Sequence, residues 1–280
     1  MSPKLFVQVV VFVTSLLLRL RESQASLAKA GCQEMCGNVS IPYPFGIGAG
    51  CYMHESFEVF CRGDHVPFWS ANNQEYPILE FSTDLVRVIH ESTTSCAEFE
   101  WIGVPQTLGE YFFLSQDRNL YVAVGCNIKA YFMTYPINRS QVCESLCNER
   151  VPIGGSPTNC TGFNGCCHLS IPKNVTSYNI MIQHKVNGSA CAQAFVSEIS
   201  ARIYFEKRQI QFPLALNWVV GLTTCHQARK KGDNLCGSNT YCVDSTNSLG
   251  YNCRCRKGYK GNPYLPNGCQ GNFQVINFTL

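Results

Sequence analysis

The sequence predicts a mostly β, disulfide-rich fold, in which a larger cysteine-rich β domain is followed by a smaller cysteine-rich module. The 280 residues include 18 cysteines, an even number that permits complete pairing. The apolar runs are short, rich in β-branched or aromatic residues, and bounded by polar turns. Because 45% of the residues are hydrophobic, the chain can bury a core and does not have the composition of a disordered protein.

The first 25 residues are predicted to be a secretory signal peptide. The apolar stretch Leu5–Leu18 is short for a membrane span, and a cut after Ala25 fits the small residues there. An uncleaved anchor is the alternative, because Arg19 and Arg21 follow the apolar stretch. Every cysteine lies downstream, as expected for an exported chain, and no later segment is long enough to span a bilayer. We therefore expect an extracellular protein.

Sequons for N-glycosylation agree with export. The triplet Asn-x-Ser/Thr is common by chance, so a single occurrence carries little weight, whereas six predict a glycoprotein. The six predicted acceptors are Asn38, Asn138, Asn159, Asn174, Asn187 and Asn277.

Cysteine spacing and charge divide the remaining chain. Twelve cysteines precede a cysteine-free interval and six follow it, so we place a boundary near Pro213–Leu222. This gives a first domain at 26–217, a module at 218–270 and a divergent tail at 271–280. Residues 26–217 hold 12 basic and 16 acidic residues, a net charge of −4, whereas residues 218–280 hold 7 and 2, a net charge of +5.

Within the first domain, composition predicts several strands and one helix. We expect a helix over Gln141–Arg150, with Ser140 as N-cap and Glu144 in the first turn. It would place Cys143 and Cys147 on one face. Strands are predicted at Leu85–Ile89, Leu120–Val124 and Ile199–Phe205, and more weakly at Tyr111–Leu114 and Asn179–Gln183.

The C-terminal module has the spacing C-x10-C-x5-C-x10-C-x-C-x13-C. Cys253 and Cys255 share one face of a strand, so they can bridge to different neighbours. Sequence alone leaves many connectivities open. The pattern resembles an epidermal-growth-factor-like (EGF-like) module. The resemblance implies the pairs Cys225–Cys242, Cys236–Cys253 and Cys255–Cys269.

The calcium-binding form of that module carries acidic or amide ligands before its first cysteine. Here residues 218–224 contain no carboxylate, and Asp244 is the one candidate ligand. Because calcium prefers several carboxylate oxygens, we predict no calcium and interpret Asp244 as a turn residue.

The first domain contains three distinctive motifs, which are its opening 36–48 (CGNVSIPYPFGIG), the segment 165–172 with its adjacent cysteines, and 191–196. Together they resemble the galacturonan-binding ectodomain of plant wall-associated receptor kinases, and 259–269 of the module is also similar to this family. The resemblance implies binding of pectic galacturonan or another cell-wall glycan, with the protein secreted or associated with the wall. It leaves open the pairing of twelve cysteines, namely Cys32, Cys36, Cys51, Cys61, Cys96, Cys126, Cys143, Cys147, Cys160, Cys166, Cys167 and Cys191.

The rings of Tyr43 and Phe45 have two interpretations. Pro42 and Pro44 favour extended backbone here, which directs both rings to one side. We favour rings that fill a small core over an aromatic platform for sugars.

Kinase motifs are absent from the sequence, and the tail 271–280 has no cysteine where the family begins a second EGF-like module. We therefore expect a receptor ectodomain that lacks its kinase.

Charge selects the candidate ligand contacts. An acidic domain does not attract a polyanion through its overall field, so we expect the basic module to contribute, or its lysines and arginines to be a solubilising surface. The candidates in the module are Arg229, Lys230, Lys231, Arg254, Arg256, Lys257 and Lys260, and the weaker ones in the first domain are Arg62, Lys129 and Arg139.

Other function classes are less well supported. A protein- or peptide-binding module is the alternative, because disulfide-rich β domains commonly bind proteins. Catalysis is not expected, since no carboxylate or histidine lies in a catalytic or metal-binding motif. The CxxxC pairs Cys32/Cys36 and Cys143/Cys147 favour disulfides over zinc in an exported chain. We expect no cofactor, no metal and no nucleic-acid partner.

Overall fold

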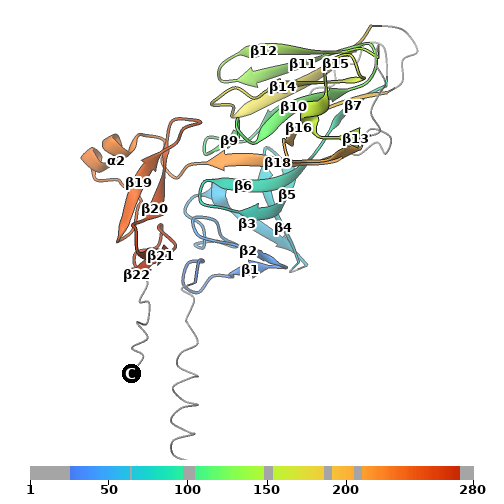
Figure 1. The fold of residues 1–280 in the computed structure, drawn as a ribbon. Coiled ribbons are helices and arrows are strands. Elements are labelled where there is room, and N and C mark those ends of the chain that lie inside the picture. The colour runs from blue at the N-terminus through green and yellow to red at the C-terminus, as the bar shows by residue number, and fades with distance from the viewer. Residues whose placement is uncertain are drawn as a thin grey trace, which may run out of the picture.

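Antiparallel strands make up about half of the described chain, which comprises residues 26–63, 65–96, 105–147, 154–185, 191–204 and 210–271 of a computed structural model (Figure 1). The mostly β, disulfide-rich fold class is confirmed. Among these residues, no helix is long and apolar enough to cross a membrane. The predicted signal peptide, residues 272–280 of the predicted tail, and the sequons at Asn187 and Asn277 lie outside the described residues.

A six-stranded sheet organises the N-terminal half. In β6 the side chains of Val86, Val88 and His90 are buried and alternate with more exposed neighbours, which is the pattern of a strand with one face on the core. The strand order is β3 (Val59–Arg62), β4 (Val66–Ala71), β5 (Gln74–Phe81), β6 (Leu85–Glu91), β18 (Gln211–Trp218) and β9 (Phe112–Leu114).

Two four-stranded sheets lie at the other end of the first domain (Figure 1). In β10 Tyr121 and Ala123 join the main core, whereas Leu120 and Val122 join a smaller cluster on the opposite face. One sheet has the order β14 (Cys166–Ser170), β10 (Asn119–Val124), β16 (Ala192–Glu198) and β7 (Thr93–Ser95). The other has the order β12 (Arg139–Ser145), β11 (Ile128–Tyr135), β15 (Ser177–His184) and β8 (Gln106–Thr107).

Short elements complete the fold. The strand pairs are β1 (Met35–Cys36) with β2 (Val39–Ser40), β13 (Gly154–Gly155) with β17 (Ile203–Tyr204), β19 (Thr240–Asp244) with β20 (Tyr251–Cys255), and β21 (Tyr259–Gly261) with β22 (Cys269–Gly271). The helical pieces are the 3₁₀ turns η1 (Glu55–Phe57) and η2 (Pro157–Asn159) and the helix α2 (Cys225–Lys231).

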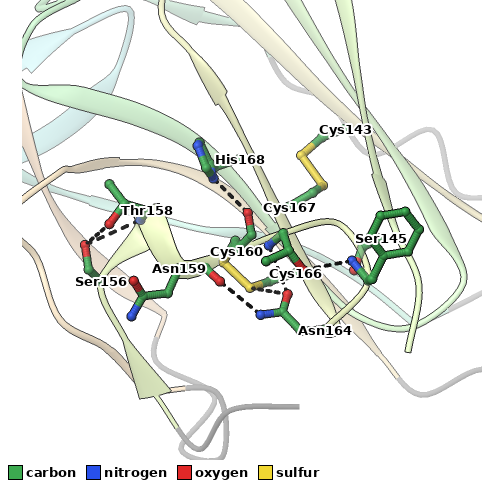
Figure 2. The surroundings of a disulfide bond; sticks show 12 residues. Cys143, Ser145, Ser156, Thr158, Asn159, Cys160, Asn164, Cys166, Cys167 and His168 are labelled. Carbon is green, nitrogen blue, oxygen red and sulfur yellow. Dashed lines mark hydrogen bonds between the residues drawn. A yellow bond between two sulfur atoms is a disulfide. The ribbon is translucent and has the colours of Figure 1, made fainter. Parts of the chain in front are cut away.

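All 18 cysteines are paired, and no disulfide joins the two cysteine groups. The adjacent Cys166 and Cys167 tie two different segments together, one near η2 and one on β12 (Figure 2). The C-terminal module has the three pairs that its resemblance implies. In the first domain the pairs are Cys32–Cys51, Cys36–Cys61, Cys96–Cys191, Cys126–Cys147, Cys143–Cys167 and Cys160–Cys166.

The predicted helix over 141–150 is wrong, because residues 139–145 form strand β12 and pair with β11. Cys143 and Ser145 are buried there, and the Ser145 hydroxyl donates to the Gly125 carbonyl at 2.7 Å. Pairing with a neighbouring strand and the Cys143–Cys167 bridge override the local capping pattern. Residues 148–150 lie outside the described residues.

The other predicted strands have mixed outcomes. β6, β10, β9 and β15 cover the segments predicted near 85–89, 120–124, 111–114 and 179–183. The strand predicted over 199–205 is largely wrong. β16 ends at Glu198, a turn follows, and among residues 199–204 only the two residues of β17 pair as a strand, while Phe205 lies outside the described residues.

The C-terminal module packs directly on the first domain. Trp218, at the end of β18, lies with its ring centroid 5.6 Å from that of Tyr264, and both belong to the main core. The buried Asn262 side chain donates to the carbonyls of Leu27 and Tyr43, each at 2.6 Å. The interval near residues 213–222 therefore begins inside a core strand and leads into a shared interface.

Candidate functional site

The basic residues of the C-terminal module lie in two separate places. Arg229, Lys230 and Lys231 form the last turn of α2 and are exposed. Cations at a helix C-terminus interact favourably with the helix dipole, so this cluster also has a structural role. The helix then ends at Gly232, whose left-handed φ of 77° suits glycine.

The second group begins within β20, continues beyond it, and is partly engaged in internal contacts. Arg254 forms an ion pair with Asp84 of the first domain at 3.1 Å, and the Arg256 guanidinium donates to the Thr240 carbonyl at 3.1 Å. Lys257 and Lys260 are exposed, and their side chains make no hydrogen bond or ion pair within the described residues.

The two basic groups are not brought together. Cys225 at the start of α2 donates its N–H to Asp244 at one end of the β19–β20 hairpin, whereas Arg256 contacts Thr240 at the other end. Figure 1 accordingly places α2 and β21 at opposite ends of the module. A ligand that contacted both groups would have to span the hairpin.

Arg62 lies in the most distinctive setting of the ten predicted contacts. It follows Phe60 on the outward face of β3, and its guanidinium lies over the ring of Phe68 on β4, 4.8 Å from the ring centroid. The Phe60 and Phe68 rings are stacked, with centroids 5.3 Å apart. The Nη2 atom of Arg62 donates to both carboxylate oxygens of Glu75 at 2.9 Å.

Strand register explains why these groups meet. Val59 and Cys61 face inward, where Cys61 bridges to Cys36, so Phe60 and Arg62 must face outward. Phe60 pairs with Phe68 across the β3–β4 ladder, which places the rings side by side. With 40% of its surface exposed, Phe60 is an apolar ring held at the surface with no core to fill.

These side chains line a shallow groove of about 430 Å³, which we call the β3–β4 groove. Its remaining walls come from the loop before η1 and from β3. The stacked rings offer an apolar surface to a flat ligand, and the guanidinium offers paired donors to a carboxylate or hydroxyl. The lining residues are Ile47, Gly48, Glu58, Val59, Phe60, Cys61, Arg62 and Phe68.

Lys129 and Arg139 lie on a different sheet from Arg62. Lys129 points outward from β11, opposite Glu144 on β12, and Glu144 forms an ion pair with Lys185. Arg139 is exposed at the start of β12, where it lines a small hollow of about 210 Å³. Neither residue adds to the β3–β4 groove.

The ring of Phe45 belongs to the core. It is 2% exposed and contacts Phe57, Phe81 and Trp218, with centroid distances of 5.2, 4.5 and 5.3 Å. Tyr43 is half-buried, and its carbonyl accepts the bond from Asn262. For Phe45 the core-filling interpretation therefore describes the structure.

Asp244 has a structural partner. Its carboxylate accepts the N–H of Cys225 at 2.6 Å, which stabilises the first turn of α2. Within the described ranges, no group of three or more histidine, cysteine or acidic side chains is placed to hold a metal ion.

The four described sequons differ in exposure. Asn38 lies at the β1–β2 turn, Asn138 at the β11–β12 turn, and Asn159 in η2, and all three are exposed. Figure 2 shows Asn159 beside the Cys160–Cys166 bridge. Asn174 is half-buried, and its N–H donates to the Asn247 carbonyl of the C-terminal module at 2.9 Å.

The sequence reasoning identified Arg62 by charge alone and missed Phe60, Phe68 and Glu75. One sequence pattern indicates the outward position of Phe60. Alternation around Cys61, which must face inward to form a disulfide, places Phe60 and Arg62 on the outward face. The contribution of Phe68 and Glu75 depends on the pairing of β3, β4 and β5, which no local pattern specifies.

Comparison with known proteins adds independent information. The profile of the wall-associated receptor kinase galacturonan-binding domain matches residues 32–90, a range that contains the whole β3–β4 groove. The chain is 32% identical to wall-associated receptor kinase 2 of Arabidopsis thaliana and 34% identical to wall-associated receptor kinase 1. Each match covers 85% of this chain and 34% of the relative, so the chain spans about a third of their length.

A further relative, wall-associated receptor kinase-like 4 of the same plant, is 32% identical over 94% of this chain and 40% of its own length. No solved structure gives a significant match.

Proposed function

Because the chain is an ectodomain of the wall-associated receptor kinase type, we propose that it binds pectic galacturonan outside the cell and that the β3–β4 groove is the contact site. The observation that carries the proposal is a coincidence of two independent results. The galacturonan-binding profile covers residues 32–90, and within that range the exposed ring of Phe60 stacks on the half-buried ring of Phe68, which lies beside a guanidinium.

The chemistry of the groove suits a uronic acid. The apolar face of a pyranose ring packs on Phe60 and Phe68, and the sugar carboxylate takes paired hydrogen bonds from Arg62. Glu75 holds Arg62 in the free protein. Because the side chains of Arg62 and Glu75 are 65% and 49% exposed, their ion pair contributes little, so exchanging Glu75 for a ligand carboxylate costs little.

Excess acidic charge limits the affinity of a single sugar. Glu58 lines the groove, Glu75 lies beside it, and residues 26–217 carry a net charge of −4. We therefore propose that a galacturonan chain gains affinity from several contacts, and that the exposed Lys257 and Lys260 supply some of them. Binding of this kind weakens as salt is added.

Binding without catalysis is the proposed activity. The relatives are named as receptor kinases, and this chain matches about a third of each. Signalling by a kinase therefore remains a property of those proteins. For this chain we propose one role, which is to contact the cell wall.

The test compares substitutions in the groove with matched substitutions elsewhere. Arg62→Gln should weaken binding of polygalacturonate and reduce its salt dependence, and Phe60→Ser should weaken binding without changing the salt dependence. Arg139→Gln removes the same charge from an exposed site on another sheet and serves as the control. Equal affinity for the Arg62 variant, the Arg139 variant and the unchanged protein would refute the groove as the contact site.

A further inference from the structure

A second cleft lies where the six-stranded sheet meets the β10–β16 sheet, and we call it the inter-sheet cleft. It has a volume of about 590 Å³ and is formed by the β5–β6 turn, the β9–β10 turn and the end of β16. It shares no residue with the β3–β4 groove. Its lining residues are Glu80, Ser82, Leu85, Arg87, Asp117, Arg118, Glu198, Ile199 and Ser200.

One side of the cleft is fixed by an ion-pair network. Arg87 donates to both carboxylate oxygens of Glu198, at 2.7 and 2.6 Å, and to Glu80 at 3.0 Å. The Glu198 side chain is only 7% exposed, so this pair is a rigid part of the wall. Glu80 is 59% exposed and keeps one carboxylate oxygen free of Arg87.

The other side carries charges that the fold does not use. The side chains of Asp117 and Arg118 are exposed and make no hydrogen bond or ion pair with any residue in the described ranges. Their backbone is nevertheless held in place, because the Arg118 carbonyl accepts the N–H of Ile199 at 2.8 Å. Immediately after them, the buried Asn119 anchors the turn through Ser115 and Ala215.

Charge indicates which ligand the cleft prefers. Three carboxylates and two guanidinium groups line it, so its net charge is −1. The surrounding domain carries −4, and this field also attracts cations. Leu85 and Ile199 provide apolar walls along which the methylene stem of a long basic side chain can lie.

We propose that the inter-sheet cleft binds a lysine or arginine side chain of an extracellular peptide or protein. In this arrangement the cationic group interacts with Glu80 and Asp117, and the stem packs on Leu85 and Ile199. The positive charge of Arg118 repels the cationic group of the ligand and limits the affinity of the cleft for it. The ligand class is opposite in charge to the polyanion proposed for the β3–β4 groove, so the two sites are separable.

The experiment titrates the protein with the peptide acetyl-Gly-Arg-Gly-Arg-Gly-amide by isothermal titration calorimetry. The peptide in which glutamine replaces both arginines is the ligand control. We expect the arginine peptide to bind and the glutamine peptide to bind at least several-fold more weakly. Equal binding of the two peptides, or no binding of either, would overturn the proposal.

Two neighbouring substitutions should then act in opposite directions. Asp117→Asn should weaken binding of the arginine peptide about two- to fivefold, and Arg118→Gln should strengthen it by a similar factor, as expected for single exposed charges. Neither side chain has a partner in the described structure, so both variants should fold normally. Glu110→Gln and Lys173→Gln make the same charge changes at other exposed positions and should leave binding unchanged.

The same variants separate this proposal from glycan binding. If Arg118→Gln weakens binding of polygalacturonate and leaves the arginine peptide unaffected, the cleft is part of the glycan site and the proposal is wrong. If Arg62→Gln abolishes glycan binding while the peptide response to the Asp117 and Arg118 variants is as described, both sites stand. If Arg62→Gln leaves polygalacturonate binding unchanged, the proposed glycan site is wrong, but the proposal for the inter-sheet cleft is unaffected.

Discussion

Replacing Asn262 by alanine should loosen the C-terminal module from the first domain. Asn262 is 3% exposed and its side chain makes three hydrogen bonds across and within the interface. The amide donates to the Leu27 and Tyr43 carbonyls at 2.6 Å, and the carbonyl oxygen accepts the Tyr264 N–H at 3.0 Å. At about 1 kcal/mol for each bond, the substitution should lower the free energy of unfolding by about 2–4 kcal/mol.

Urea denaturation followed by tryptophan fluorescence measures this effect, because Trp218 lies at the interface. Asn267→Ala, an exposed asparagine of the same loop, is the matched control and should change the free energy by less than about 0.5 kcal/mol. Because one core cluster includes both modules, the unchanged protein should unfold in a single transition. Equal stability of the Asn262 and Asn267 variants would refute the idea that Asn262 holds the modules together.

Three further predictions concern a buried histidine, a tightly packed glycine and the basic end of helix α2. Burial lowers the pKa of His90, whose ring is hydrogen-bonded to the Val196 carbonyl, to about 4. A histidine with a lowered folded pKa stabilises the fold only while neutral, so its contribution to the free energy of unfolding should be constant above pH 6.5, the unfolded value, and fall by up to about 3 kcal/mol towards pH 4. A His90→Gln variant should lose this pH dependence in thermal unfolding, and a variant that keeps it would contradict the assignment to His90. Gly221→Ala would place a Cβ atom 2.3 Å from the Tyr251 ring, so it should lower the free energy of unfolding by about 1–3 kcal/mol. A Cβ atom at Gly232 meets no atom within 4 Å, and only the left-handed φ of that residue opposes Gly232→Ala. Equal losses of stability in the two variants would contradict a steric cause at Gly221. Neutralising residues 229–231 to glutamine should lower the melting temperature slightly through lost helix-dipole interaction, and a large loss of polygalacturonate affinity in this variant would move the glycan site to α2.

The fold class was predictable from the sequence, but several strands were not. Strands β6 and β10 are plain β-branched runs, which is why composition identifies them. β4 and β5 contain Pro67 and Pro77, and proline within a run argues against a strand. In β12 a helix-like capping pattern conflicts with pairing to β11, and the long-range pairing prevails.

The candidate site was predictable only in part. Arg62 could be identified by its charge, whereas its importance depends on Phe68 and Glu75, which come from neighbouring strands. The register that brings these three residues together is set by tertiary packing and by the Cys36–Cys61 bridge. The disulfide pairing of the first domain has the same origin, since cysteine spacing alone leaves it open.

Hydrogen exchange of the backbone amides during titration with oligogalacturonides tests the glycan proposal most directly, because it locates the contact without any substitution. Binding at the β3–β4 groove should slow exchange in residues 58–70, which include β3 and all but the last residue of β4, and the effect should diminish as salt is raised. Slower exchange confined to α2 or to residues 254–260, with none in 58–70, would contradict the proposal.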